Sequence, residues 1–584
     1  MTDKSQNNQI KYRIFRCGKS DFCKEEILNA DKNHSEKQLK AIAKAGFNGI
    51  WLRGKLRELS PGNLFEPFVK NVPQRLVSLK NVCKRANDAG IGVWLFCTEP
   101  LGLPVNHPFW KKYPHLAGQK TQIYNYEPEY ALCSSQPEVQ NYLKDGFVQL
   151  FTAIPLSGVI LITSSEQVSN CYAHILSNPA NYKDPEAFWN RECKCQRCRN
   201  RKAVDVISEI ITNINSSITK VRPNAKTIAW DWSWNMHCRP PYSAITDKLP
   251  RDIIVMADFE RGGKITRLQK QRNVEEYSLA YPGPSPRFKK HSAKTTKTHP
   301  LFAKLQINTT HELATAVNLP MVVSLYRKIK YLRDNGCSGT MACWNFACEP
   351  DTLNVSAVND LCVRKKIPQE KIWLSELARS YFGKNLNPDD IVRCWYAFHN
   401  AMQSYPLSGC KFLYWSPMNY AVAYPLKQQF EGKPMGPSWL GHKWGDRIED
   451  TFGDFSLTEI VKLLQSLQKH WLNAVGLYES ALSGSAETAT HNEIASAKFA
   501  GCCFRSCWNI YRWYQIHKNS RQSAFTTREV SIIKDELENI EPVLSCLNTD
   551  PRLGFHQEGQ CYMLDAKSVR RKIKDLKQKL GLQK

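Results

Sequence analysis

The sequence has no run of 18 apolar residues, so no transmembrane helix is expected. Its opening residues, MTDKSQNNQIKYRIF, lack the apolar core of a signal peptide. It contains no zinc-finger spacing, no aromatic-rich RNA-recognition signature, no internal repeat and no low-complexity tract. We therefore expect a cytoplasmic protein without membrane contact, whose 21 cysteines are thiols or metal ligands rather than disulfides.

What the chain does contain is enough apolar sequence for a large core. Hydrophobic residues make up 42% of its 584 residues and charged residues 23%, which argues against disorder of the whole chain. The formal net charge of +26 suggests a polyanion partner. Lys and Arg are nevertheless spread along the sequence and concentrate only at 286–299 and 567–579. We expect no nucleic-acid partner, and polyanion binding remains a minor alternative.

Short apolar segments alternate with helical patterns over the first 350 residues. The helical pattern EKQLKAIAKAG (36–46), for example, is followed by the strand pattern FNGIWL. Eight strands are predicted, at about 12–16, 47–52, 91–96, 158–163, 226–230, 253–257, 302–307 and 339–344. Eight strand–helix units indicate a (β/α)₈ TIM barrel. The alternative is an open doubly wound sheet, which the absence of a glycine-rich phosphate loop after the first strand disfavours.

After residue 350 the patterns become helical. We predict a barrel domain at 1–365 and a mainly α-helical C-terminal region at 366–584, with an irregular aromatic-rich segment at 405–455. Helices are expected at 369–382, 388–404, 457–479, 491–517, 527–546 and 566–581. The last helix carries an apolar stripe, Val569, Ile573, Leu576 and Leu580, which would pack inside the chain or against a second subunit of a homo-oligomer.

Polar and aromatic side chains follow the strands at the end where a barrel keeps its active site. They are Arg53 and Arg57, Glu99, Glu166, Asp231 with Trp232 and Trp234, Asp258 and Glu260, Asn308 with His311 and Glu312, and Trp344 with Asn345 and Glu349. Carboxylates, amides, arginines and indoles together suit a sugar, because indole faces stack on pyranose rings and charged groups bind hydroxyls.

Glycoside hydrolysis needs a carboxylic acid that protonates the leaving oxygen and a second group that attacks or activates water. Glu166 is the acid candidate, since it follows the apolar strand GVILIT and an apolar wall would raise its pKa. The alternative is a solvent-facing loop residue that caps the next segment.

Several stretches resemble glycoside hydrolase family 20, the β-N-acetylhexosaminidases. They are GFNGIWLRGKLREL (46–59), YALCSSQPEVQNYL (130–143), GVILITSSE (158–166), AKTIAWDWSW (225–234), FERGG (259–263), AKLQINTTHEL (303–313) and MACW (341–344). The resemblance covers roughly residues 10 to 350. It implies that Glu166 is the general acid/base, and that Trp232 or Trp234 and Trp344 contact the sugar.

One position departs from the family pattern. Family 20 enzymes carry Asp-Glu where this chain has Ser165-Glu166, and that Asp orients the acetamido group of the substrate as the nucleophile. Asp231 or Asp258 would have to supply the missing carboxylate, or Glu312 would act as a direct nucleophile. Arg53, Glu99 and Asn308 are expected to line the sugar pocket.

A cysteine-rich segment, RECKCQRCRNRK (191–202), follows the fourth strand. Cys193, Cys195 and Cys198 together with Cys171 upstream would make a tetrahedral, structural zinc site, in which His174 could replace one ligand. The alternative is a group of free thiols. No organic cofactor is expected.

The sequence thus predicts a glycosidase that is exo-acting on a β-linked N-acetylhexosamine or a related short glycan. The alternative is a binding protein instead of an enzyme, namely a catalytically inactive glycan-binding barrel.

Overall fold

The computed structural model describes residues 9–18, 20, 25–122, 127–164, 167–173, 189, 193–309, 311–344, 349–438, 444–518 and 524–582. The predicted acid Glu166, its neighbour Ser165, and the candidates His174 and Asn345 lie outside the described residues.

Eight parallel strands close into a barrel in the order β1-β13-β12-β9-β8-β7-β3-β2, which confirms the predicted fold. They are β1 (Tyr12–Phe15), β2 (Gly49–Arg53), β3 (Gly92–Cys97), β7 (Gly158–Leu161), β8 (Lys226–Trp230), β9 (Ile254–Asp258), β12 (Leu301–Leu305) and β13 (Gly339–Ala342). Alternate residues fill the interior with large apolar side chains, among them Trp94, Ile160 and Phe302. The strands are nearly continuous apolar runs because helices cover their outer side.

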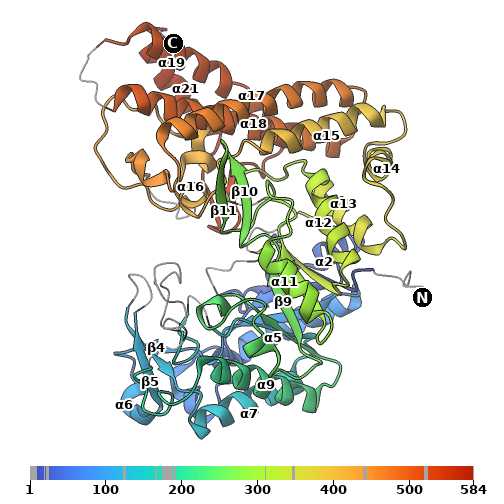
Figure 1. The fold of residues 1–584 in the computed structure, drawn as a ribbon, viewed down its shortest axis with the longest axis vertical. Coiled ribbons are helices and arrows are strands. Elements are labelled where there is room, and N and C mark those ends of the chain that lie inside the picture. Colours follow the sequence, from blue (N-terminus) through green and yellow to red (C-terminus); the bar gives the residue numbers. More distant parts are fainter. Residues whose placement is uncertain are drawn as a thin grey trace.

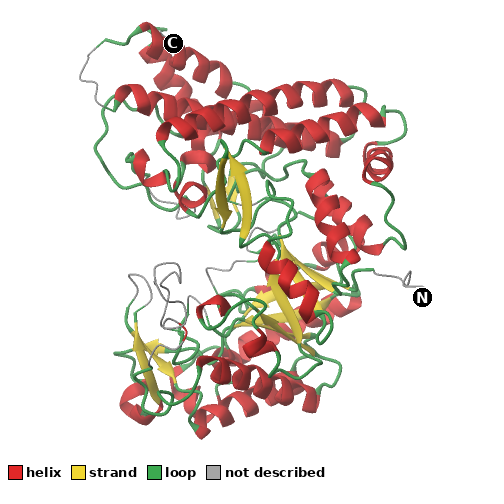
Figure 2. Ribbon diagram, viewed as in Figure 1, coloured by secondary structure: helices red, strands yellow, loops and turns green. Residues whose placement is uncertain are grey.

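Helices between the strands and after the last strand surround the barrel (Figure 2). The longer ones are α2 (Glu36–Lys44), α5 (Val72–Asp88), α7 (Pro137–Ala153), α9 (Ala203–Val221), α11 (Pro286–Thr295), α12 (Val322–Asp334) and α13 (Leu353–Val363). Single turns are α1 (Ala30–Asn33), α3 (Leu56–Leu59), α4 (Gly62–Phe65), α6 (Phe109–Lys112) and α10 (Ser243–Thr246). A small antiparallel sheet of β4 (Leu103–Pro104), β6 (Glu129–Leu132) and β5 (Ala117–Thr121) follows β3.

Helix α11 occupies the segment that stands out in the sequence only as a basic run. Ser285 caps it by accepting a hydrogen bond from Phe288 N, and Pro286 takes the first helical position. Both are ordinary signals for a helix start. The helix matters because its Arg287 and His291 point back to the ends of β8 and β9.

The chain beyond the barrel is mainly helical (Figure 1). Its helices are α14 (Glu370–Phe382), α15 (Pro388–Met402), α16 (Lys411–Trp415), α17 (Leu457–Leu482), α18 (Thr488–His517), α19 (Thr527–Ile540), α20 (Val543–Thr549) and α21 (Ala566–Lys579). The helix predicted at 527–546 is two helices, because Pro542 interrupts it. Val569 and Leu576 of α21 are buried within the chain. No helix among the described residues is long and apolar enough to cross a membrane.

The C-terminal region contacts the barrel through two barrel loops. The hairpin β10 (Gly263–Arg267)–β11 (Lys270–Val274) extends from the end of β9 toward the helices (Figure 1), where Lys270 pairs with Glu459 at 2.8 Å. After β12, His311 Nε2 lies 2.9 Å from Glu558, which sits in the turn between β14 (Phe555–His556) and β15 (Cys561–Tyr562). The helical region therefore borders the face of the barrel at which the strands end.

Candidate active site at the barrel mouth

Aromatic rings form the floor of the barrel mouth. Trp344, just after β13, stacks on Trp51 of β2 with ring centroids 4.9 Å apart and planes 18° apart. Trp230, the last residue of β8, lies 5.3 Å from Trp344 and 5.6 Å from Trp232. The half-buried Trp232 and Trp344 come from strands far apart in sequence, and the closed barrel brings them to one surface.

Trp234 does not belong to this floor. Its side chain is fully buried and packs edge-on against Tyr242, with ring centroids 6.0 Å apart. Of the two indoles predicted after β8, Trp232 is therefore the half-buried one at the floor, and the Arg261 guanidinium lies 3.7 Å from its ring centre.

Asp231 and Asp258, at the ends of neighbouring strands β8 and β9, share one guanidinium. Arg287 Nη2 lies 3.1 Å from Asp258 Oδ2, and Arg287 Nη1 lies 3.7 Å from Asp231 Oδ2. His291 Nε2 is 3.2 Å from Asp231, and the indole N–H of Trp230 donates to Asp258 at 3.0 Å. Both carboxyl groups are fully buried.

The surroundings push the pKa values of these two carboxyls in opposite directions. Burial works to raise the pKa of Asp231, but Arg287 and His291 outweigh it and hold that pKa below its ordinary value. Burial raises the pKa of Asp258, and Arg287 and Arg261 offset this only in part. Paired carboxyls with divergent pKa values are the arrangement that acid–base enzymes use.

Glu312 holds a loop together. Its fully buried carboxylate accepts hydrogen bonds from Ser278 Oγ at 2.5 Å, Leu279 N at 2.7 Å and Ala280 N at 3.1 Å. A carboxylate with three such donors is a poor nucleophile, because attack on a sugar would require it to give them up. The geometry therefore does not support the predicted role of Glu312 in catalysis.

Glu99 and Arg57 connect the loops after β2 and β3. Glu99 is buried and accepts from Leu56 N at 2.7 Å and from Leu101 N at 3.2 Å, and burial raises its pKa. Arg57 donates to Leu101 O at 3.1 Å. Arg53 is the half-buried last residue of β2. Glu99 thus holds the loops after β2 and β3 together by accepting hydrogen bonds from their backbone N–H groups.

A second group of buried charged residues lies beside β9 and β12. Glu260 pairs with Lys328 of α12 at 2.5 Å, and both side chains are fully buried. Lys304 of β12 is also buried, its ammonium 3.2 Å from the ring centre of Tyr277, and burial lowers its pKa. The sequence did not identify Lys304. Whether a lysine within an apolar strand points into the barrel or away from it is known only once the barrel has closed.

Two further predicted residues follow β12. Asn308 is buried, and its Oδ1 has no hydrogen-bond partner among the described residues. His311 pairs with Glu558 and packs edge-on against Tyr414, 4.3 Å between ring centres. Both partners come from the C-terminal region. Glu349, the last of the predicted residues, follows positions 345–348, which lie outside the described residues.

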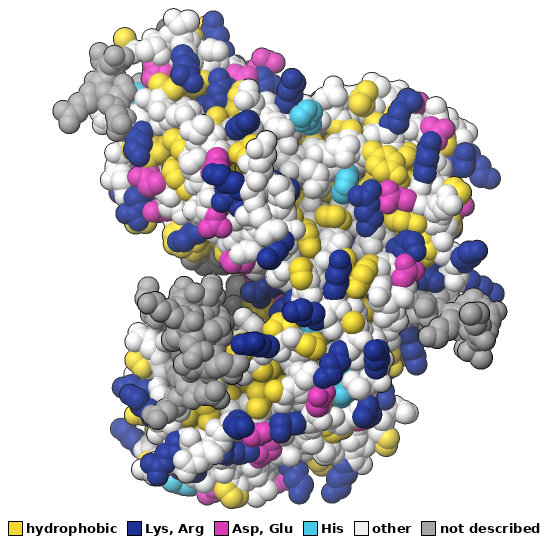
Figure 3. Space-filling view, in the orientation of Figure 1, with side chains coloured by type: hydrophobic (Ala, Val, Ile, Leu, Met, Phe, Trp, Pro, Cys, Tyr) yellow, Lys and Arg dark blue, Asp and Glu magenta, His cyan; other side chains and the backbone are white. Residues whose placement is uncertain are grey.

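The loop after β7 leads to a basic cavity beside the mouth. Ser164, two residues before Glu166, is hydrogen-bonded to His237. His237 lines a cavity of about 580 Å³ together with Arg199, Arg201, Lys202, Arg239 and Lys248, and Asp205 is the acidic residue on its wall. Its lining favours an anionic group. Elsewhere Lys and Arg are dispersed over the face shown in Figure 3.

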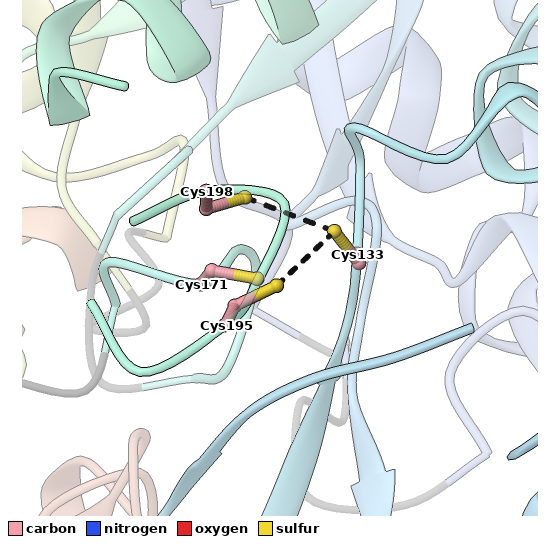
Figure 4. Close-up of side chains that lie close together, drawn as sticks. All are labelled: Cys133, Cys171, Cys195 and Cys198. Carbon is pink, nitrogen blue, oxygen red and sulfur yellow. Dashed lines mark hydrogen bonds between the residues drawn. The ribbon is translucent and has the colours of Figure 1, made fainter. Parts of the chain in front are cut away.

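Four cysteine side chains converge in this same loop region (Figure 4). They are Cys133, Cys171, Cys195 and Cys198, all buried, with their sulfur atoms within 4.8 Å of one another. Three of them were predicted as a metal site. Cys193 lies outside the group, and Cys133, which follows β6, takes the fourth place. The sequence could not show this, because Cys133 and Cys195 are 62 positions apart in the chain.

The sequence matches no protein-family model and no curated protein. Solved structures with similar folds are glycoside hydrolases of several families. A family 89 enzyme from Clostridium perfringens, in complex with PUGNAc, has a TM-score of 0.50 and 11% identity over 97% of this chain and 58% of that one. A family 138 enzyme targeting pectin rhamnogalacturonan II has a TM-score of 0.49 and 9% identity over 93% of this chain and 63% of that one.

The chitobiase of Flavobacterium johnsoniae, a family 20 protein, has a TM-score of 0.35 and 10% identity over 90% of this chain and 74% of that one. The chain spans less than two thirds of the family 89 and family 138 proteins. At 11% identity the likeness to the family 89 enzyme shows the fold alone.

Proposed function

We propose that this protein is a glycoside hydrolase that holds its substrate on the aromatic floor of the barrel mouth. That floor, in which the half-buried Trp232 and Trp344 pack against the fully buried Trp51 and Trp230, is the observation that carries the proposal. Indole faces beside buried polar groups such as Asn308 suit a pyranose ring, whose two faces are apolar and whose edge is lined with hydroxyls. The proposed substrate is a β-linked N-acetylhexosamine or a related short glycan, cleaved from its end.

Glu166 is the proposed general acid/base. It follows β7 in the sequence, and catalytic residues of such barrels generally come after the strand ends. The predicted carboxylates Glu99, Asp258 and Glu312 accept hydrogen bonds from internal donors, and Glu260 is held by Lys328. Such bonds keep a carboxyl group away from a substrate oxygen. We therefore assign proton transfer to Glu166, on its position after β7, and leave the engaged carboxyl groups in supporting roles.

Asp231 and Asp258 are the proposed partners of Glu166. They lie at the ends of the next two strands, and their opposed pKa shifts would keep one ionised while the other holds a proton more readily. An ionised Asp231 could orient a substrate group or stabilise positive charge on the sugar ring.

The test is hydrolysis of a panel of aryl β-glycosides, with N-acetylated and plain sugars, by the full chain and by Glu166→Gln. We expect a loss of about 10²-fold or more with a poor phenol leaving group. The loss should be smaller with dinitrophenyl glycosides, because a good leaving group needs no proton. Glu487→Gln, an exposed change far along the chain, is the control. Full activity of Glu166→Gln on every substrate would overturn the role of Glu166.

A catalytically inactive glycan-binding barrel is the second candidate. Two observations favour it: the internal engagement of the predicted carboxylates, and Ser165 where family 20 enzymes have Asp. In that case calorimetry would detect glycan binding that Trp232→Ala weakens, while no glycoside of the panel is turned over. Turnover that Glu166→Gln abolishes would exclude this candidate.

A further inference from the structure

We propose that Cys133, Cys171, Cys195 and Cys198 bind one structural zinc ion. This inference does not depend on the proposed glycosidase activity, because it rests on the side chains beside the mouth and not on the mouth itself. It also replaces one member of the ligand set that the sequence suggests.

The distances between the sulfur atoms fit a tetrahedral zinc site. Cys133 Sγ lies 3.7 Å from Cys195 Sγ and 3.7 Å from Cys198 Sγ (Figure 4). A tetrahedron with Zn–S bonds of about 2.3 Å has edges of about 3.8 Å between its sulfurs. A disulfide would instead need a separation of about 2.05 Å. The four cysteines are all free thiols, so the sulfurs are spaced as ligands and not as disulfide partners.

The local backbone also resembles that of a metal-binding turn. Cys195 and Cys198 belong to one turn, in which Cys198 N and Arg199 N both donate to Cys195 O, at 3.1 and 2.9 Å. This C-x-x-C turn directs both sulfurs to one side. Cys133 and Cys171 come from two other segments, which gives four ligands and leaves no open coordination position. A closed S₄ site is typical of a structural zinc.

Neighbouring groups would offset the charge of the site. Four thiolates around Zn²⁺ carry a net charge of −2, and the four thiols release their protons when the metal binds. Arg197 Nε lies 3.4 Å from Cys133 Sγ, and Ser135 Oγ lies 3.3 Å from Cys198 Sγ. Arg201 donates to that same Ser135 at 2.7 Å. Such second-sphere donors stabilise thiolate ligands.

Gly118 shows how closely this site is packed. A Cβ atom at Gly118 would lie 2.4 Å from Cys171 Sγ and 3.3 Å from the Cβ of Cys133. No larger residue fits there without moving a ligand. The glycine therefore leaves room for the sulfur atoms between β5 and the loop after β7.

Cys193 supplies a matched control. It is buried beside the cluster, where its Sγ lies 3.5 Å from Cys171 O and 3.8 Å from Gln119 Oε1 and also interacts with the Cys171 thiol. It has the same side chain, the same burial and the same segment as Cys195, and it lies outside the four-sulfur group.

The zinc would fasten the loop that carries Glu166. Cys133 belongs to the segment after β6, Cys171 to the loop after β7, and Cys195 and Cys198 precede α9. One ion would join all three segments. Because it has no open position, it would act on folding and rigidity and not on the reaction.

The experiment measures metal in the full chain, purified under reducing conditions without chelator, by mass spectrometry of the elements. We expect about one zinc per chain in the wild type and in Cys193→Ser, and less than about 0.2 in Cys133→Ser. Less than about 0.2 zinc in the wild type, iron in its place, or zinc retained by Cys133→Ser but lost by Cys193→Ser would each overturn the proposal.

A second measurement covers the case in which Cys133→Ser does not fold. Zinc in the wild-type chain is exchanged for Co²⁺, and the absorption spectrum is recorded. Four thiolates in a tetrahedron give intense visible d–d bands and a sulfur-to-cobalt charge-transfer band in the near ultraviolet. Those bands are expected, and a weak octahedral spectrum would overturn the four-sulfur assignment.

Discussion

Arg287 Nη2 lies 3.1 Å from Asp258 Oδ2, although the two residues are 29 positions apart and belong to a helix and a strand. The same guanidinium lies 3.7 Å from Asp231. One cation thus stands between two buried carboxyls at the ends of adjacent strands. Without it, two negative charges would face each other in a medium of low dielectric constant.

Replacement of Arg287 by Met should therefore destabilise the fold strongly. Removing one partner of a buried ion pair costs about 3–5 kcal/mol, because the remaining charge loses its nearest counter-charge. Here Arg261, 3.9 Å from Asp258, would compensate for the loss only in part. Urea unfolding of Arg287→Met and of the exposed control Lys289→Met measures this. Adding Asp258→Asn to Arg287→Met should recover part of the loss. Equal stability of both Met variants and the wild type would contradict the prediction.

Replacement of Glu312 by Gln separates a structural role from a catalytic one. The amide cannot accept from all three donors of 278–280, so we expect a loss of roughly 1–3 kcal/mol in unfolding free energy. Activity measured well below the unfolding midpoint should change little. Unchanged stability together with a loss of turnover would instead identify Glu312 as a nucleophile.

Trp232 and Trp234 make a matched pair of indoles two positions apart. Trp232→Ala should weaken substrate binding by roughly 0.5–1.5 kcal/mol, about 2- to 10-fold in KM, because a half-buried stacking face is lost. Trp234→Phe should leave KM unchanged and lower the melting temperature, since Trp234 is buried against Tyr242. Steady-state kinetics and thermal melts check both; a KM effect confined to Trp234→Phe would reverse the assignment.

Glu493 of α18 should make stability depend on pH. Burial raises its pKa to about 7, and hydrogen bonds from Leu353 N and Asn318 offset this only in part. The folded protein then holds this proton more tightly than the unfolded chain. The contribution of Glu493 to the free energy of unfolding is complete below the pKa that this carboxyl has in the unfolded chain. It is lost as the pH rises through about 7, and the loss is up to about 3 kcal/mol.

Urea unfolding at pH 5 and pH 8 tests this. The wild type should lose more stability over that interval than Glu493→Gln, whose side chain does not ionise. The exposed residue Glu538 is the control, and Glu538→Gln should behave like the wild type. A pH dependence unaffected by Glu493→Gln would contradict the prediction.

The sequence by itself determined the barrel, because its signals are local. Each of eight apolar segments between amphipathic helices predicts one buried parallel strand. The end of each strand is predicted where the apolar run stops. The same reasoning predicted which residues follow the strands, among them Trp232 and Trp344. It also indicated three of the four clustered cysteines, since Cys195 and Cys198 lie in one turn.

Only the tertiary structure decided which of these residues meet and what they do there. Barrel closure placed Trp344 on Trp51, and helix α11 returned Arg287 to Asp231 and Asp258. The loop after β6 supplied Cys133 in place of Cys193. A sequence pattern fixes the direction of a side chain within its own element, but contacts between distant elements depend on how the whole chain packs.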